Sequence, residues 1–250
     1  MTDRQALKED LVSAAHALSA LGLVTAFGHV SARYDDHMLI TPAIDLGEAA
    51  TDTILEIALD ADELPPGTPG EVWIHFAVYR ERPDVMAVAR AMPEAAFALG
   101  ALTALIVPLH GQGAMLGEAV PVHDAAHLMR TRDIAESAAR SLGNADAVVL
   151  RGNGAVTTGT TPGQTVARMW LLDASCRVHL AARPAGTSTP LSSEEIASWR
   201  AAAPPLLDRL WEHLRRGGGP PSGPAGKQSQ YVITQAPPPR VPLNRNGPGL

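Results

Sequence analysis

The chain contains a single cysteine, Cys176, among its 250 residues. An intrachain disulfide is therefore excluded, and a reducing compartment is favoured. No apolar run reaches the roughly 18 residues that a membrane-spanning helix needs. The N-terminus is charged and has no apolar signal core. These absences predict a cytoplasmic protein that does not associate with membranes.

Basic residues are also sparse. The 20 Lys and Arg residues against 26 Asp and Glu residues give a formal net charge of -6, and no basic run is present. The charge composition therefore argues against nucleic acid as a partner. A hydrophobic content of 46% with 18% charged residues is that of a globular protein. We expect the partner to be a small molecule.

The chain has two parts of different composition. Residues 1–216 carry periodic apolar segments separated by turn residues, whereas residues 217–250 are dominated by Pro and Gly. The second part cannot bury enough apolar surface to fold alone. The sequence therefore predicts one folded domain over 1–216 and a flexible tail over 217–250.

Hydrophobic periodicity predicts an α/β protein. Strands are expected at 27–34, 38–41, 53–59, 85–89, 105–109, 119–122, 147–151 and 155–158. Helices are expected at 7–21, after 71, at 93–101, 134–142 and 161–182, and from 192 onward. Capping patterns support the first helix (Thr2 and Gln5), the long helix (Thr161 to Gln164) and the last one (Ser192 and Glu195). We expect a central, mostly antiparallel sheet with helices on both faces.

One segment contains side chains suited to chemistry. Glu71 and His75 lie four residues apart, which places both on one face of a predicted helix. An Arg-Pro-Asp turn follows, and then a short apolar strand that ends on Arg90 and Met92. A loop that leaves a strand end is a usual place for chemistry. This segment is the centre of the candidate site.

Five segments, in order, resemble the class II aldolase/adducin family. They are GHVSAR at 28–33, MLITP at 38–42, EVWIHFAVYRERPD at 71–84, VPLHGQGAMLG at 107–117 and LRGNG at 150–154. The resemblance extends over about residues 6–183. The GHVSAR and RGxG segments resemble the branch that contains decarboxylases of hydroxylated aromatic acids. The resemblance implies a nine-stranded sheet flanked by helices, and a homotetramer with active sites between subunits.

In that family three histidines hold a divalent metal, usually zinc, and a neighbouring glutamate is the general acid/base. The resemblance places Arg90 and Met92 at two of the histidine positions and Asn153 at the third. A guanidinium does not lose its proton in proteins, and a thioether is a soft ligand. We therefore expect no metal and no other cofactor. The glutamate is retained as Glu71.

Other departures argue against a sugar-phosphate aldolase. Pro69-Gly70 and Ala43-Ile44 stand where those aldolases carry phosphate-binding Ser-Ser and Thr-Gly pairs. Pro69 has no N–H to donate. Gly111 stands where they have a proton-donating tyrosine.

We hypothesise that Arg90 replaces the metal cation, because a guanidinium can pair a carboxylate or enolate oxygen bidentately. The candidate catalytic residues are Glu71 as acid/base, with His29 or His110 as a second proton carrier. The candidate substrate-binding residues are Arg90, Ser31, His75, Asn153 and Arg151. The predicted function is metal-independent lyase-type chemistry (C–C cleavage or decarboxylation, dehydration, or isomerisation) on a small carboxylate or hydroxy-carbonyl substrate. Similarity to the decarboxylase branch suggests secondary metabolism.

Two alternatives stay open. In the first, Glu71 and Arg90 neutralise each other in a vacated cavity, and the protein is a catalytically silent binding or structural member of the family. In the second, a metal binds elsewhere, for example at His123 and His127, whose spacing suits a helix.

Overall fold

The computed structural model describes residues 3–217, so that the predicted tail lies outside the described residues except for Gly217. Eight strands form one sheet in the order β3-β2-β1-β4-β8-β7-β6-β5. Their bounds are β1 His29–Tyr34, β2 His37–Ile40, β3 Leu55–Ala58, β4 Ala87–Ala91, β5 Leu105–Ile106, β6 Val120–His123, β7 Ala147–Leu150 and β8 Ala155–Gly159.

Neighbouring strands pair antiparallel throughout this sheet except for β6 and β7, which are parallel. The expected mostly antiparallel sheet is therefore confirmed. The expected nine strands are not found within residues 3–217, where the sheet has eight. The Gly-rich segment after β5 forms a short helix, α4 (Gly111–Ala114).

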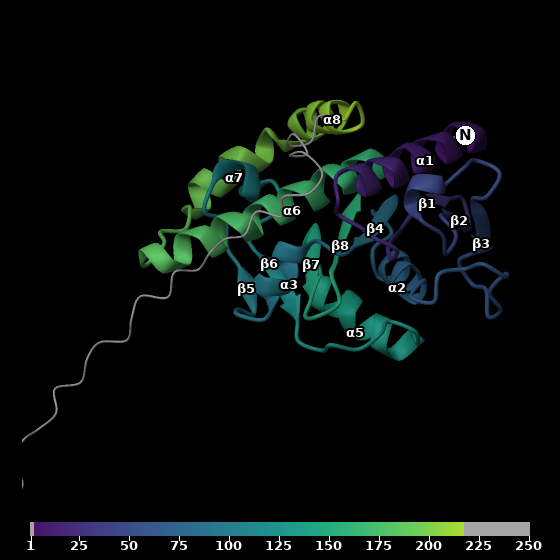
Figure 1. Cartoon of the computed structure of the whole chain (residues 1–250), viewed down its shortest axis with the longest axis horizontal. Coiled ribbons are helices and arrows are strands. Elements are labelled where there is room, and N and C mark those ends of the chain that lie inside the picture. The colour runs from purple at the N-terminus through teal and green to yellow at the C-terminus, as the bar shows by residue number, and fades with distance from the viewer. Residues whose placement is uncertain (1–2, 218–250) are drawn as a thin grey trace, which may run out of the picture. The chain divides into compact units, whose positions relative to one another are not determined.

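Helices cover both faces of the sheet (Figure 1). On one face lie α1 (Arg4–Ala20), α3 (Glu94–Gly100), α6 (Pro162–Ala182) and α8 (Ala203–Leu214), which share a core cluster with inward residues such as Val149. On the other face α2 (Trp73–Glu81) and α5 (Arg132–Leu142) pack on alternate strand residues such as Val148. This alternation follows from the two-residue period of a strand. The remaining helices are α7 (Ser193–Ala201), η1 (Leu46–Glu48) and η2 (Arg183–Ala185).

The predicted helix starts were correct in part. The side chain of Thr161 accepts the N–H of Gln164 at 3.1 Å, and Ser192 with Glu195 forms a reciprocal capping box. At the first helix the cap is Asp3 rather than Thr2, because the Asp3 carboxylate accepts the N–H of Gln5.

The helix after Glu71 differs from the prediction. It begins at Trp73, and Glu71 lies in the turn before it. In that turn the backbone bonds have i to i+3 spacing, with Ile74 N donating to Glu71 O at 3.4 Å. Glu71 and His75 therefore do not share one helix face. The strand β4 also extends further than predicted, so that Arg90 lies inside it.

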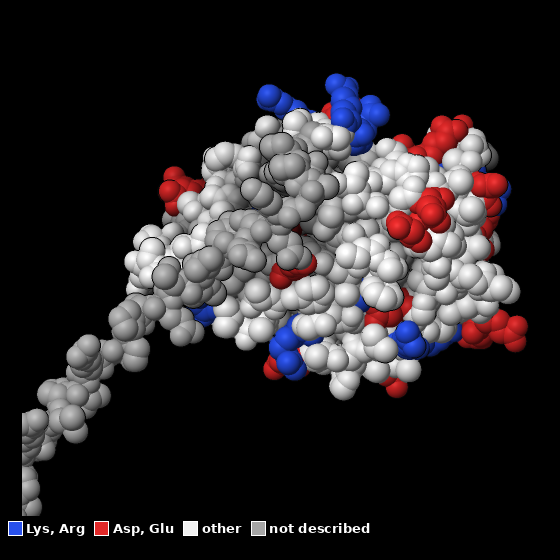
Figure 2. Space-filling view, in the orientation of Figure 1, with Lys and Arg blue, Asp and Glu red and all other residues white. Residues whose placement is uncertain are grey.

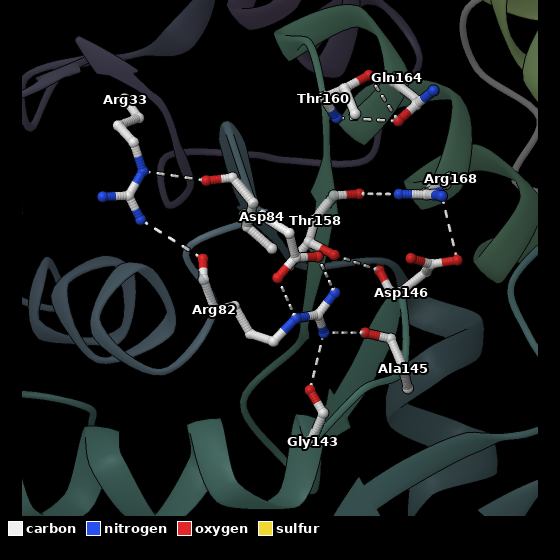
Figure 3. Close-up of polar contacts among 11 residues, drawn as sticks. Arg33, Arg82, Asp84, Gly143, Ala145, Asp146, Thr158, Thr160, Gln164 and Arg168 are labelled. Atoms are coloured by element: carbon white, nitrogen blue, oxygen red, sulfur yellow. Dashed lines mark hydrogen bonds and ion pairs between the residues drawn. The ribbon is translucent and has the colours of Figure 1, made fainter. Parts of the chain in front are cut away.

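The Arg-Pro-Asp turn anchors the start of β4 through a polar network (Figure 3). The guanidinium of Arg82 donates to both carboxylate oxygens of Asp84 at 2.8 Å and to the carbonyl of Gly143 at 2.8 Å. Arg168 pairs with Asp146 at 3.1 Å and thereby joins α6 to the residue that precedes β7. This network fixes the end of β4 that is remote from Arg90.

The C-terminal helices pack closely on two glycines. A Cβ at Gly111 would collide with the indole of Trp199, and one at Gly163 would collide with the indole of Trp211. Helix α7 therefore packs directly against α4, and helix α8 packs directly against α6.

Charged side chains are spread over one face of the molecule. On the face shown in Figure 2, Lys and Arg side chains form small separate groups, and Asp and Glu side chains lie between some of them. No helix within residues 3–217 is both long and apolar enough to cross a membrane.

Candidate active site

A cavity of about 520 Å³ lies where β1 begins and β4 ends. Its walls come from the segments before β1 and after β2, the turn before α2, the end of β4 and the loops after β6 and β7. The apolar lining includes Phe27, Ile44, Met92 and Leu128. The polar and charged lining consists of His29, Glu71, Arg90, Arg130 and Asn153.

Three of these side chains form one buried cluster. The guanidinium of Arg90 lies 2.5 Å from Glu71 Oε2 and donates to Asn153 Oδ1 at 2.6 Å. The Asn153 amide donates to Glu71 Oε1 at 3.0 Å. The backbone N–H of Met129 donates to the same Glu71 oxygen at 2.8 Å. Both carboxylate oxygens of Glu71 are therefore engaged.

The turn after β7 places Asn153 in this cluster. Gly152 and Gly154 flank it with φ values of +70° and +83°, which L side chains rarely adopt. A Cβ at Gly154 would also collide with the carbonyl oxygen of Ala91. The glycines thus let the turn approach the end of β4 closely enough for Asn153 to reach Arg90.

A second group of buried side chains extends behind His29. His29 Nδ1 lies 2.6 Å from His75 Nε2, and His75 Nδ1 lies 2.6 Å from Ser31 Oγ. Ser31 Oγ is 2.8 Å from the hydroxyl of Tyr79. The chain of hydrogen bonds thus begins at the cavity wall and ends under α2. His29 Nε2 has no partner among residues 3–217.

Burial keeps both histidines neutral. Burial, aided by His75 and Arg90, holds the pKa of His29 well below its usual value. Burial and the nearby Arg90 lower the pKa of His75 to about 3. Burial also lowers the pKa of Arg90, and the Glu71 carboxylate opposes that shift. At neutral pH the histidine pair is therefore uncharged and is positioned as a hydrogen-bonding group.

The predicted site residues fall into three places. Glu71, His29, Arg90 and Asn153 line the cavity. Ser31 and His75 are fully buried behind His29 and do not line it. His110 and Arg151 lie outside the cavity wall. The functional roles of all eight predicted site residues remain predictions.

His110 and Arg151 do not line the cavity. His110 caps α4, where Nδ1 accepts the N–H of Gly113 at 3.2 Å and Nε2 lies 3.2 Å from Ser175 Oγ. Burial lowers its pKa, and His179 adds to the effect. Arg151 is exposed and its guanidinium is 2.5 Å from Asp124.

Sequence reasoning missed the loop that joins β6 to α5. The backbone of this loop contacts the cluster, since Asn153 donates to the carbonyl of His127 at 3.1 Å and Met129 donates to Glu71. Arg130 then adds a second guanidinium to the cavity wall. No periodicity or motif marks the segment as part of a site. The only feature of the sequence that could have indicated a functional role for this loop is its position directly after a strand.

His123 and His127, the pair considered for a metal at another place, do not lie on a helix. His123 ends the strand β6, and its Nδ1 lies 2.8 Å from Ser141 Oγ. Among the described residues, no three His, Cys, Asp or Glu side chains gather as a metal-binding group.

The three positions that the resemblance assigns to metal-binding histidines hold side chains that are poor ligands for a divalent metal. Guanidinium, thioether and amide groups stand at the positions that the resemblance assigns to histidines, and only the amide offers a hard oxygen. That amide oxygen already accepts from Arg90. The carboxylate oxygens of Glu71 are likewise occupied by nitrogen donors.

Comparison with known proteins places this geometry in a family. Residues 9–180 match the "Class II Aldolase and Adducin N-terminal domain". A 3,4-dihydroxyphthalate decarboxylase from Terrabacter sp. (strain DBF63) is 30% identical over 233 residues, covering 85% of this chain and 98% of that protein. L-fuculose phosphate aldolase from Escherichia coli is 30% identical over 158 residues, covering 62% and 73% of the two chains.

Solved structures agree on the fold. An L-fuculose 1-phosphate aldolase superposes with a TM-score of 0.73 at 22% identity, covering 79% of this chain and 95% of that one. A Thermus thermophilus l-fuculose-1-phosphate aldolase gives 0.67 at 27% identity, covering 73% and 98%. The predicted resemblance is confirmed at the level of the family, which includes aldolase and decarboxylase lyases. The chain belongs to the class II aldolase and adducin family.

Proposed function

We propose that the chain is a metal-independent lyase-type enzyme that acts on a small carboxylate or hydroxy-carbonyl substrate in the cavity beside Glu71. C–C cleavage, dehydration and isomerisation all fit such a substrate. The decarboxylase relative, which this chain matches over 98% of the relative's length, favours decarboxylation of an aromatic hydroxy acid. A cytoplasmic location and a role in secondary metabolism belong to the same proposal.

The observation that carries the proposal is the guanidinium of Arg90. Arg90 is 3% exposed and lies in the cavity wall, and its Nε has no partner among the described residues. Guanidinium groups keep their proton in proteins. A fixed, buried cation is well suited to stabilise negative charge that develops on a substrate oxygen.

Decarboxylation explains how the other residues would act. In an aromatic hydroxy acid a proton is first added to the ring carbon that bears the carboxylate, which turns the hydroxyl-bearing carbon into a ketone. When the carboxylate then leaves as CO₂, its bonding electron pair moves into the ring and on to the ketone oxygen, which becomes a phenolate that Arg90 would stabilise. His29 is the better-placed carrier, because its Nε2 has no partner among the described residues. Glu71 can exchange a proton only after it releases one of its present donors.

His110 enters this scheme only through a second copy of the chain. In its own chain it contacts Gly113 and Ser175 and does not line the cavity. The proposed homotetramer would allow it to serve a neighbouring cavity. Light scattering coupled to size-exclusion chromatography tests the assembly, and a monomer at working concentration would remove His110 from the mechanism.

One observation favours the second candidate, a silent binding or structural protein. Glu71, Arg90 and Asn153 already pair with one another without a ligand. A cluster of this kind can be retained to keep a buried charge paired. The cavity beside it nevertheless remains open, which is why the enzyme is the first candidate.

The test combines metal content with turnover. Metal in the purified protein is measured by inductively coupled plasma mass spectrometry, with soaking in zinc, iron and manganese. A triple variant, Arg90→His, Met92→His and Asn153→His, is the positive control for restored binding. The same samples are incubated with 3,4-dihydroxyphthalate and simpler hydroxybenzoates, and products are followed by proton NMR with and without a chelator.

We expect substoichiometric metal in the natural chain and product formation that the chelator does not change. One tightly held metal per chain, with turnover lost on chelation, would refute metal independence. Absence of turnover in every metal-free and metal-loaded sample would favour the silent candidate.

A further inference from the structure

The loop between β6 and α5 is anchored to the cavity at two alternate residues. The carbonyl of His127 accepts the Asn153 amide at 3.1 Å, and the N–H of Met129 donates to Glu71 at 2.8 Å. The Met129 side chain is fully buried in the core under α2 and α5. The residues that follow each anchor, Leu128 and Arg130, line the cavity.

Arg130 differs from Arg90 in its surroundings. The charge of Arg90 is opposed by Glu71 at 2.5 Å. Arg130 is exposed, and its side chain makes no hydrogen bond or ion pair with another residue of 3–217. Its guanidinium stem passes over Gly70, where a Cβ would meet Arg130 Nε at 3.4 Å. The absence of a side chain at Gly70 therefore leaves room for Arg130 beside Glu71.

Two large apolar side chains also line this cavity. Phe27 is 65% exposed and Leu128 is 55% exposed, and both line the same cavity as Arg130. Large exposed apolar side chains around a cavity indicate a surface that a ligand covers. A ligand that satisfies this arrangement has a flat or bulky apolar body and an anionic group that reaches Arg130.

We propose that Arg130 binds a carboxylate of the ligand that is separate from the group held at Arg90, and that Phe27 and Leu128 contact its apolar body. The cavity therefore selects aromatic dicarboxylates over monocarboxylates. This inference rests on the proposed function only in taking the cavity as the substrate site. It adds the residue that determines specificity.

The test is binding, without turnover, of three probes of equal ring size: phthalate, benzoate and benzamide. Isothermal titration calorimetry at constant ionic strength compares the natural chain with Arg130→Gln. The matched control is Arg132→Gln, which removes the same charge at the start of α5, where Arg132 pairs with Asp62 outside the cavity. A charge-assisted hydrogen bond in this setting is expected to change affinity by about tenfold or more.

We expect the natural chain to bind phthalate more tightly than benzoate, and Arg130→Gln to abolish that preference by weakening phthalate at least tenfold. Benzamide binding should be unchanged in all three proteins, and Arg132→Gln should resemble the natural chain. Equal losses of phthalate affinity in both variants would show a general effect of positive charge and would refute the inference. Phthalate affinity that is the same in Arg130→Gln and in the natural chain would also refute it, as would a natural chain that does not bind phthalate.

The outcome is separable from that of the proposed function. If Arg130-dependent phthalate binding is found but no sample turns over, the lyase fails and the carboxylate site stands. If turnover is found and Arg130→Gln leaves the KM of a dicarboxylate unchanged, the lyase stands and the carboxylate site fails.

Discussion

The guanidinium of Arg90 lies 2.5 Å from Glu71 Oε2, and both side chains are almost fully buried. Each partner offsets the cost of taking the other's charge out of water. Asn153 bonds to both and completes the cluster. The stability of this part of the molecule and its chemistry therefore depend on the same three side chains.

Removal of one partner should be far more costly than removal of both. Arg90→Met leaves the Glu71 carboxylate buried without its cation, and we expect a loss of about 3–5 kcal/mol in the free energy of unfolding. The double variant Arg90→Met, Glu71→Gln leaves no unpaired charge and should recover a large part of that loss. Urea unfolding followed by circular dichroism measures both. A double variant no more stable than the single one would contradict the pairing.

The hydrogen-bond chain behind His29 should hold its ring in one tautomer. Ser31→Ala removes the group between His75 and Tyr79, and the unpaired buried partner should cost about 1–3 kcal/mol. Tyr79→Phe should cost less and should broaden or shift the imidazole signals of His29. Nitrogen-15 NMR of histidine-labelled protein reads the tautomer directly. Tyr34→Phe, in the same strand as Ser31, is the control, and equal spectral changes there would remove the role assigned to Tyr79.

Stability should fall in mild acid. His75 has a folded-state pKa of about 3, against 6.5 in the unfolded chain, and the pKa of His29 is lowered as well. Below pH 6.5 the unfolded state binds protons that the folded state does not, so that the free energy of unfolding decreases from about pH 6.5 toward pH 3. Denaturant unfolding at several pH values measures the slope. His75→Gln should flatten it, whereas exposed His213→Gln should leave it unchanged.

The turn that carries Asn153 should not tolerate a side chain at Gly154. Gly154→Ala combines a φ of +83° with a collision against the Ala91 carbonyl. Gly67→Ala is the matched control, with a φ of +82° and nothing within 4 Å. The control should lose about 1 kcal/mol, and Gly154→Ala clearly more, because the turn must also move. Equal midpoints in thermal unfolding would show that the close approach is unimportant.

Periodicity and turn chemistry predicted most of the framework. The strands around Ser31, Val88 and Val148 were located because buried apolar residues alternate or run together there, and α6 was bounded correctly by its Thr161 cap. The start of the helix after Glu71 was misplaced by two residues. Its first turn has i to i+3 bonds that hydrophobic spacing does not distinguish from a helix.

The candidate site was predictable only where motifs supplied it. Glu71, Arg90 and Asn153 meet because β4 and the turn after β7 end together, which the family resemblance implied. Arg130 and the N–H of Met129 were missed, because a backbone donor and an exposed arginine in an irregular loop leave no periodic signal. Their place depends on the tertiary approach of that loop to Glu71.

The indoles of Trp199 and Trp211, which pack on Gly111 and Gly163, have a consequence for any shortened form of this protein. The family match ends at residue 180, but the rings come from α7 and α8, beyond that limit. A chain shortened to the matched region would keep two ring-sized hollows on α4 and α6 with nothing to fill them. Helices that lie outside the family boundary thus pack on the matched region, and a larger residue at either glycine would require a smaller one in place of the tryptophan that contacts it.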